Sequence, residues 1–108
     1  GELKHGTLAL IVSGVPVIVL ATQMDVYDKT VSNLQEVKAR EAVVIAIGFE
    51  GDTSLEKYAD HVIYIPRTDK YLAPLMAVLP LQLLAYAALT RGCDVDKPRN
   101  LAKSVTVE

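Results

Sequence analysis

The chain has 108 residues, of which 51% are apolar, and a formal net charge of −2 from 11 basic and 13 acidic side chains. This length suits one compact domain with a hydrophobic core, and the balanced charge argues against a nucleic-acid partner or an anionic membrane surface. A single cysteine, Cys93, excludes an intrachain disulfide, and with only His5 and His61 as histidines no zinc site is expected. The first residues lack the apolar run of a signal peptide, so a cytoplasmic location is expected.

Uninterrupted apolar runs predict the strands. Residues 16–21 (PVIVLA) and 42–47 (AVVIAI) are rich in β-branched side chains and do not alternate with polar residues. Such runs are typical of strands that are covered on both faces in a parallel sheet. Gly48 marks the expected end of the second strand. A third strand is predicted over 61–65, before Pro66.

Helical patterns follow the first two strands. An N-cap at Asp25 predicts a helix that runs to about Arg40, because apolar residues recur there every three or four positions. The residues on this apolar side are Tyr27, Val31, Leu34 and Val37. A shorter helix is expected over 55–59, after the hydroxyl residues Thr53 and Ser54.

The segment 71–89 is apolar at almost every position, with Gln82 as its clearly polar residue. Its length approaches the ~20 residues of a membrane-spanning helix. Two prolines, many alanines and the polar remainder of the chain favour a helix buried in a large core or between subunits. We therefore expect no membrane partner. Gly92 is the expected C-cap of this helix.

Strands that alternate with helices predict an α/β fold built around a parallel sheet. The three predicted strands are few, because sheets have about five or six strands on average. We therefore expect this chain to hold only the later strands of its sheet.

Two kinds of side chain are candidates for chemistry. Glu2 and His5 are three residues apart and would share a helix face, but an iron site would need carboxylates from other helices, so a solvated first turn is the favoured interpretation. Lys103 lies in the tail 101–108, where a lysine is usually solvated. The chain has no glycine-rich phosphate-binding motif, and neither a metal nor a cofactor is expected. These patterns alone describe an α/β domain fragment.

A resemblance to a known family goes further. Residues 94–108 (DVDKPRNLAKSVTVE) closely resemble the C-terminal ending of glucosamine-6-phosphate synthases, the glutamine–fructose-6-phosphate aminotransferases. Residues 1–6 (GELKHG) are similar to a motif from the second sugar-isomerase (SIS) subdomain of that family. The segments 16–19, 32–40 and 80–86 also look familial, so the resemblance covers the whole chain.

The resemblance implies a SIS-type αβα sandwich with a parallel sheet. The chain would be the C-terminal part of that domain, residues 1–108, with a catalytic tail from about 94 to 108. The family makes glucosamine 6-phosphate from fructose 6-phosphate and ammonia derived from glutamine. The resemblance also implies three kinds of partner: these sugar phosphates, the upstream glutaminase and SIS domains, and a second subunit in a homodimer.

The resemblance also implies site residues. Lys103 matches the family lysine that forms a Schiff base with the open-chain ketose, and backbone around Ala102 matches the segment that contacts the sugar. His5 matches a histidine that assists ring opening in the active site of the other subunit. A Schiff base requires a neutral amine, so the pKa of Lys103 must be depressed from its usual value of ~10.4.

The chain also departs from the family pattern. Thr7 stands where a proline is usual, and Ala87 stands where a histidine is common. The family's proton-transfer glutamate and phosphate-binding loops match no residue here, so we expect the fragment to be inactive alone. A non-catalytic SIS module that binds a phosphosugar or holds subunits together is the alternative, and Lys103 argues against it.

Overall fold

A computed structural model of the chain describes residues 3–93. It contains two compact units, residues 1–77 and 78–108. The boundary between the units falls within the last helix.

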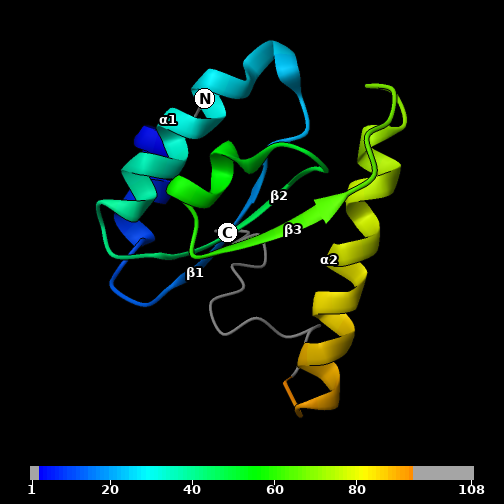
Figure 1. Cartoon of the computed structure of the whole chain (residues 1–108). Coiled ribbons are helices and arrows are strands. Elements are labelled where there is room, and N and C mark those ends of the chain that lie inside the picture. The colour runs from blue at the N-terminus through cyan, green and yellow to red at the C-terminus, as the bar shows by residue number, and fades with distance from the viewer. Residues whose placement is uncertain (1–2, 94–108) are drawn as a thin grey trace, which may run out of the picture. The chain divides into compact units, whose positions relative to one another are not determined.

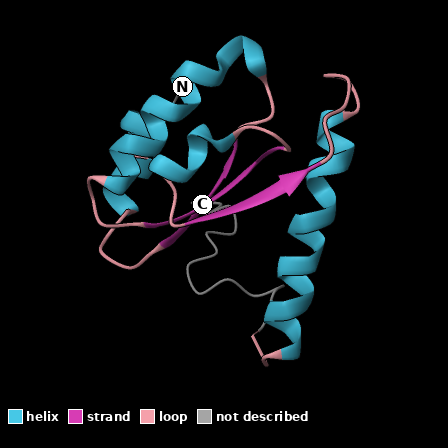
Figure 2. Cartoon of the chain, viewed as in Figure 1, coloured by secondary structure: helices cyan, strands magenta, loops and turns pink. Residues whose placement is uncertain are grey.

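The first unit is built on a parallel sheet of three strands in the order β1-β2-β3. The strands are β1 (Pro16–Leu20), β2 (Val43–Phe49) and β3 (His61–Ile65). Both pairings are parallel. In the register of β1 with β2, Ile18 lies opposite Ile45. Figures 1 and 2 show the three strands running side by side in one direction. The α/β class and the parallel sheet predicted from the sequence are confirmed.

Strand β2 runs two residues beyond its predicted end. Gly48 pairs with Tyr64, and Phe49 pairs with Ile65. The prediction that Gly48 closes the strand was therefore wrong. A glycine fits this position for a different reason. A Cβ placed on Gly48 would lie 2.5 Å from Leu55 Cδ1. The glycine allows a neighbouring element to approach the sheet closely.

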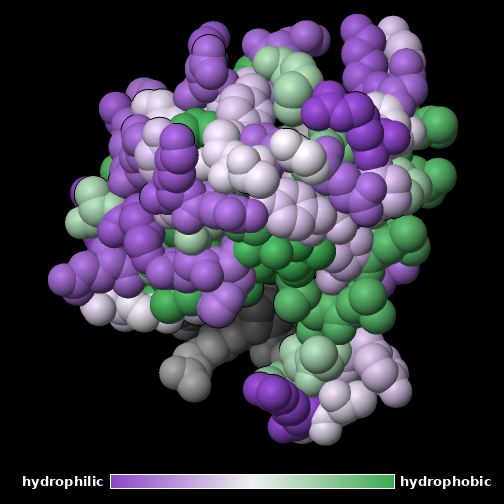
Figure 3. Space-filling model, viewed as in Figure 1, coloured by the Kyte–Doolittle hydropathy of each residue, from purple (hydrophilic) through white to green (hydrophobic). Residues whose placement is uncertain are grey.

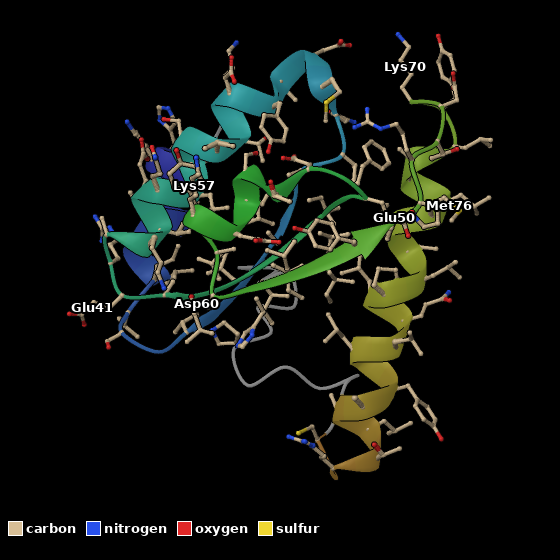
Figure 4. All side chains as sticks on the ribbon, in the orientation of Figure 1. Glu41, Glu50, Lys57, Asp60, Lys70 and Met76 are labelled. Atoms are coloured by element: carbon tan, nitrogen blue, oxygen red, sulfur yellow. The ribbon has the colours of Figure 1, made fainter. Side chains whose placement is uncertain are left out.

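Helix α1 (Tyr27–Lys38) follows β1. The predicted apolar side is confirmed, since Leu34 and Val37 are buried and Tyr27 and Val31 pack against the core. An exposed ion pair between Lys38 and Asp60 joins the end of α1 to the start of β3. Figure 4 labels Asp60. Asp60 Oδ2 also accepts the backbone N–H of Val44 at 2.8 Å.

The predicted N-cap of α1 was wrong. Asp25 lies within a 3₁₀ turn, η3 (Met24–Val26), and the cap position is Val26, which makes no side-chain capping bond. The turn supplies backbone bonds instead, because the N–H of Val26 donates to the carbonyl of Gln23 and the N–H of Tyr27 to that of Met24. These bonds occupy donors that a capping side chain would otherwise satisfy.

Three further 3₁₀ helices complete the first unit. They are η1 (Leu3–His5), η2 (Thr7–Leu10) and η4 (Thr53–Lys57). The predicted helix at 55–59 corresponds to η4, which begins two residues earlier. The reason is Asp52, whose side chain accepts the backbone N–H of Ser54 and so caps the element.

The main cluster of buried apolar side chains lies on one face of the sheet. Val44 and Ala46 of β2 are fully buried against Leu34 and Val37 of α1 and Leu55 of η4. In Figure 1, α1 and η4 lie on this same face. Each fully buried large apolar side chain contributes about 1.5–3 kcal/mol. This layer is therefore the main source of stability of the first unit.

The opposite face is open along β1. Ile18 and Leu20 are each 44% exposed, and Val43 at the start of β2 is 36% exposed. The prediction that both strands are covered on both faces was wrong for β1, because the core elements of the first unit pack on the other face. Strand β1 is also the outer strand of the described sheet.

The predicted long apolar helix is confirmed as α2 (Ala73–Thr90), with Pro80 in its interior. Gly92 has φ of 78° and donates to the carbonyl of Leu89, while the N–H of Cys93 donates to the carbonyl of Ala88. These two bonds form a Schellman motif, so Gly92 ends the helix as predicted.

Helix α2 presents a large apolar surface. Leu79, Leu83, Tyr86 and Leu89 are all more than half exposed. Figure 3 shows hydrophobic residues, in green, along this helix. Within residues 3–93 it is the helix that has the length and composition of a membrane span, a test that the core helix of a soluble protein also passes.

Prediction of self-association. We expect the 108-residue chain to self-associate at micromolar concentration, because exposed apolar surface of this extent is costly in water. Leu83→Gln should weaken the association several-fold in sedimentation velocity. Thr90→Gln places the same side chain at an exposed position of α2 without removing a leucine, and it should leave the association unchanged. A stable monomer at these concentrations would contradict the prediction.

Candidate functional site

A cavity lies at the carboxyl ends of the strands. In parallel α/β sheets this edge is the usual position of a ligand site, because the loops that follow the strands converge there. The cavity has a volume of about 520 Å³. Its lining residues, which define the carboxyl-edge pocket, are Thr22, Gln23, Met24, Asp25, Phe49, Arg67, Thr68, Lys70 and Tyr71.

Each strand supplies part of the carboxyl-edge pocket. Thr22 begins the loop after β1 and is 7% exposed, although the turn that continues from it is open to solvent. Phe49 is the last residue of β2 and is 4% exposed. Arg67 and Lys70 come from the loop between β3 and α2, where Figure 4 labels Lys70. The pocket therefore depends on the register of all three strands.

The charged groups of the carboxyl-edge pocket are predominantly basic. Arg67 and Lys70 are opposed by one lining carboxylate, Asp25. The Arg67 guanidinium carbon lies 5.7 Å from the centre of the Phe49 ring, and Lys70 Nζ lies 5.3 Å from that of Tyr71. These cation–π contacts hold the two cations beside aromatic rings.

A hydrogen-bonded cluster fixes the loop after β2. Tyr27 Oη donates to Asp52 Oδ2 at 2.5 Å and lies 2.6 Å from Ser54 Oγ. The backbone N–H and the hydroxyl of Ser54 both donate to Asp52 Oδ1. Because Tyr27 begins α1, the cluster ties that helix to the β2–η4 connection.

The cluster changes the acidity of its members. Burial raises the pKa of Asp52, but the hydrogen bonds from Ser54 and Tyr27 outweigh it, so the pKa lies below its ordinary value of 3.8. Burial, followed by the bond to the Asp52 carboxylate, raises the pKa of Tyr27. Asp52 is therefore ionised and fully engaged at neutral pH.

Of the site residues expected from the sequence, the structure describes His5. His5 is exposed at the end of η1 and does not line the cavity. Lys103 and Ala102 lie outside the described residues. His61 is exposed at the first residue of β3, the end opposite to the carboxyl edge. Within residues 3–93 no three His, Cys, Asp or Glu side chains are grouped for a metal.

Sequence reasoning missed the basic residues of the pocket. Arg67 comes two residues after the end of β3, as Thr22 does after β1, and Lys70 lies further along the β3–α2 loop. In a parallel sheet the residues after each strand meet at one edge, so this position was the available signal. This position in the sequence could not reveal the stacking of Arg67 on Phe49, because Phe49 was expected to lie beyond the end of β2.

The fold and the pocket define the class of protein: an α/β domain with a parallel sheet and a ligand-sized cavity at its carboxyl edge. Comparison with known families identifies the family within this class. The SIS domain family matches residues 1–91. The chain therefore belongs to the SIS domain family.

Similar proteins are found over the whole chain. It is 60% identical over 109 residues to a glutamine–fructose-6-phosphate aminotransferase [isomerizing] from Symbiobacterium thermophilum, and 59% identical to the protein of that name from Clostridium tetani. In each case the match covers 100% of this chain and 18% of the relative. The chain thus spans under a fifth of the length of these relatives.

A solved structure is similar as well. The C-terminal domain of glucosamine-fructose-6-phosphate aminotransferase from Francisella tularensis matches with a TM-score of 0.73 and 35% sequence identity. The match covers 90% of this chain and 28% of that one. The resemblance noted from the sequence motifs is confirmed by both comparisons.

Prediction for Asp52. Asp52→Asn should lower the free energy of unfolding at pH 6 by about 1 kcal/mol, because the neutral amide offers one acceptor oxygen in place of the two that Tyr27 and Ser54 use. A carboxyl whose pKa is lowered by folding stabilises the fold above its unfolded value and loses this effect as pH falls through the folded value. The difference between wild type and variant should therefore shrink below about pH 4.

Urea denaturation followed by circular dichroism between pH 2.5 and 7 measures this difference. Asp28→Asn is the matched control, since it removes an exposed carboxylate from the first turn of α1. An Asp52→Asn effect that stayed constant over the whole pH range would contradict the role given to the ionised carboxylate.

Proposed function

We propose that this chain, residues 1–108, is the C-terminal part of the isomerase module of a glutamine–fructose-6-phosphate aminotransferase. The observation that carries the proposal is the identity of about 60% to proteins of that name, which extends over the entire chain. The proposed activity is the conversion of fructose 6-phosphate to glucosamine 6-phosphate with ammonia from glutamine. It belongs to a longer protein that includes glutaminase and further SIS domains.

Lys103 is the proposed imine-forming residue. Its amine would attack C2 of the open-chain ketose, and loss of water would leave a carbon–nitrogen double bond between substrate and enzyme. This step requires a neutral amine, which an ordinary lysine provides about one time in a thousand at pH 7. Desolvation within a closed site would lower the pKa and raise the reactive fraction. The backbone at Ala102 is the proposed sugar contact beside it.

His5 is the proposed group for opening the sugar ring. An imidazole exchanges protons near neutral pH, which suits transfer to and from a ring oxygen. Its exposed position at the end of η1 supports a role toward a substrate held by a second subunit. We accordingly propose a homodimer as the working assembly, in the cytoplasm, without a cofactor.

Prediction for Lys103. In a longer chain that includes the preceding part of the module, borohydride reduction with fructose 6-phosphate should add the mass of the reduced sugar phosphate to the peptide that contains Lys103. Lys103→Arg should remove the adduct, because a guanidinium keeps its proton and does not attack. Lys97→Arg, in the same tail, is the matched control and should label normally.

An adduct on another lysine would overturn the assignment of Lys103. Sugar-phosphate binding without any adduct would favour the alternative of a non-catalytic SIS module.

Prediction for the chain alone. The 108 residues by themselves should convert no fructose 6-phosphate, even with ammonium supplied in place of glutamine. A positioned general base contributes roughly 10²–10⁴-fold to a rate, and binding energy from the phosphate orients the ketose against the amine. The family's residues for both roles lie in the preceding part of the relatives. Turnover that survives repurification and disappears in Lys103→Ala would contradict this expectation.

A further inference from the structure

We infer that the ion pair between Lys4 and Glu36 positions His5 for its reaction with the sugar ring. This inference rests on the proposed role of His5 and adds two positioning residues to it. Lys4 Nζ lies 2.8 Å from Glu36 Oε1. The Lys4–Glu36 pair joins η1, which carries His5, to helix α1. In Figure 1 the blue segment that contains η1 lies beside α1.

The element that carries His5 is too short to hold its own position. A 3₁₀ helix of three residues makes few backbone hydrogen bonds, and their geometry is poorer than in an α-helix. None of the three residues of η1 is buried, and His5 itself is exposed. The orientation of the imidazole therefore depends on contacts that the neighbours of His5 make with the rest of the fold.

The neighbours of His5 make contacts of two kinds. Leu3 and Leu8, on either side of it, pack against the core cluster. Apolar contacts are non-directional, so they fix how deep the segment lies rather than how it is turned. The Lys4–Glu36 pair adds a directed contact. Successive residues of a 3₁₀ helix are turned about 120° from one another, so holding Lys4 toward α1 also sets the direction of His5.

Glu36 depends on Lys4 for its charge partner. The side chain of Glu36 is 27% exposed, against 68% for that of Lys4. Its Oε2 atom is buried and has no hydrogen-bond partner within residues 3–93. A carboxylate oxygen that is withdrawn from water without a partner destabilises a fold. The carboxylate therefore has a reason to be there other than stability, and the placement of η1 supplies one.

Opening of the sugar ring is sensitive to such placement. The bond between C2 and the ring oxygen breaks, the ring oxygen gains a proton and the C2 hydroxyl loses one, which leaves a ketone and a free hydroxyl. An imidazole that exchanges these protons must lie within hydrogen-bond distance of the oxygen. A misplacement of about 1 Å can lower a rate roughly 10²-fold. A partly exposed ion pair, in contrast, contributes little to stability, so its loss should leave the chain folded.

The first measurement is the {¹H}–¹⁵N NOE of the ¹⁵N-labelled 108-residue chain, which reports backbone order on the ps–ns timescale. Lys4→Gln and Glu36→Gln should each lower the NOE of the His5 amide, whereas Lys4→Arg keeps the charge and should preserve it. Lys38→Gln removes the lysine of another exposed ion pair of α1 and is the matched control. An unchanged NOE at His5 in both pair variants would overturn the inference.

The second measurement is turnover of a longer chain that includes the preceding part of the module, with ammonium as the nitrogen source. Lys4→Gln and Glu36→Gln should each lower kcat for fructose 6-phosphate about ten-fold, with KM little changed, because positioning is felt in the transition state. The double variant should lose no more than either single one, since both remove the same contact. Lys4→Arg should retain most of the activity, and Lys38→Gln all of it.

A substrate that cannot form a ring separates the placement of His5 from general damage. 5-Deoxyfructose 6-phosphate lacks the hydroxyl that closes the furanose ring, so it presents its ketone without ring opening. The rate of the borohydride-trapped adduct should fall in Lys4→Gln with fructose 6-phosphate and stay at the wild-type value with the deoxy sugar. An equal fall with both sugars would place the damage elsewhere and overturn the inference.

His5→Ala separates this inference from the proposed function. A loss of kcat in His5→Ala, with a smaller loss in the two pair variants that Lys4→Arg avoids, supports the inference. A loss in His5→Ala without any loss in Lys4→Gln or Glu36→Gln would overturn the inference and leave the role of His5 intact. Wild-type turnover by His5→Ala would overturn the proposed role of His5 and the inference together.

Discussion

The architecture of the first unit depends on the close approach of Leu55 to the sheet at Gly48. Any Cβ at that position would lie 2.5 Å from Leu55 Cδ1, well inside the contact distance of two carbons. The glycine therefore permits η4 to lie directly on β2. Leu55 is fully buried there and joins the core layer formed with α1.

Features of the functional site follow from that contact. With η4 in place, its cap Asp52 lies within reach of Tyr27 and Ser54, so the connection after β2 is tied to the first turn of α1. The strand continues through Gly48 to Phe49, which pairs with Ile65 of β3. The Phe49 ring then supports Arg67 at the carboxyl-edge pocket. A packing constraint in the middle of the sheet thus positions a charged group at its end.

The exposed apolar surface has a different origin. The buried cluster formed with α1 and η4 lies on one face of the sheet. On the other face Ile47 and Phe49 of β2 are buried, while Ile18 and Leu20 of β1 remain accessible. Helix α2 is apolar around its circumference, and such a helix is stable in water only when other protein surface covers it. In a protein of the length of the relatives, we expect further chain to provide that cover, and a second copy to provide it for the 108 residues alone.

The local elements were determined by the sequence itself. The three strands, the apolar side of α1 and the Schellman ending of α2 at Gly92 are encoded by short-range patterns, because burial periodicity and positive φ act within a few residues. The motifs at both ends of the chain also identified its family.

Tertiary structure decided where some elements end and which distant side chains meet, which local patterns cannot predict. Asp25 is a reasonable helix cap by residue type, but the backbone bonds of η3 replaced it. Gly48 suggested a strand end, yet the reason for a glycine there is Leu55, seven residues further along the chain. The pairing of Arg67 with Phe49 joins residues eighteen positions apart, and it arises because parallel pairing aligns the ends of β2 and β3. Local patterns specify which elements form, whereas contacts between distant residues decide where they end and which side chains meet.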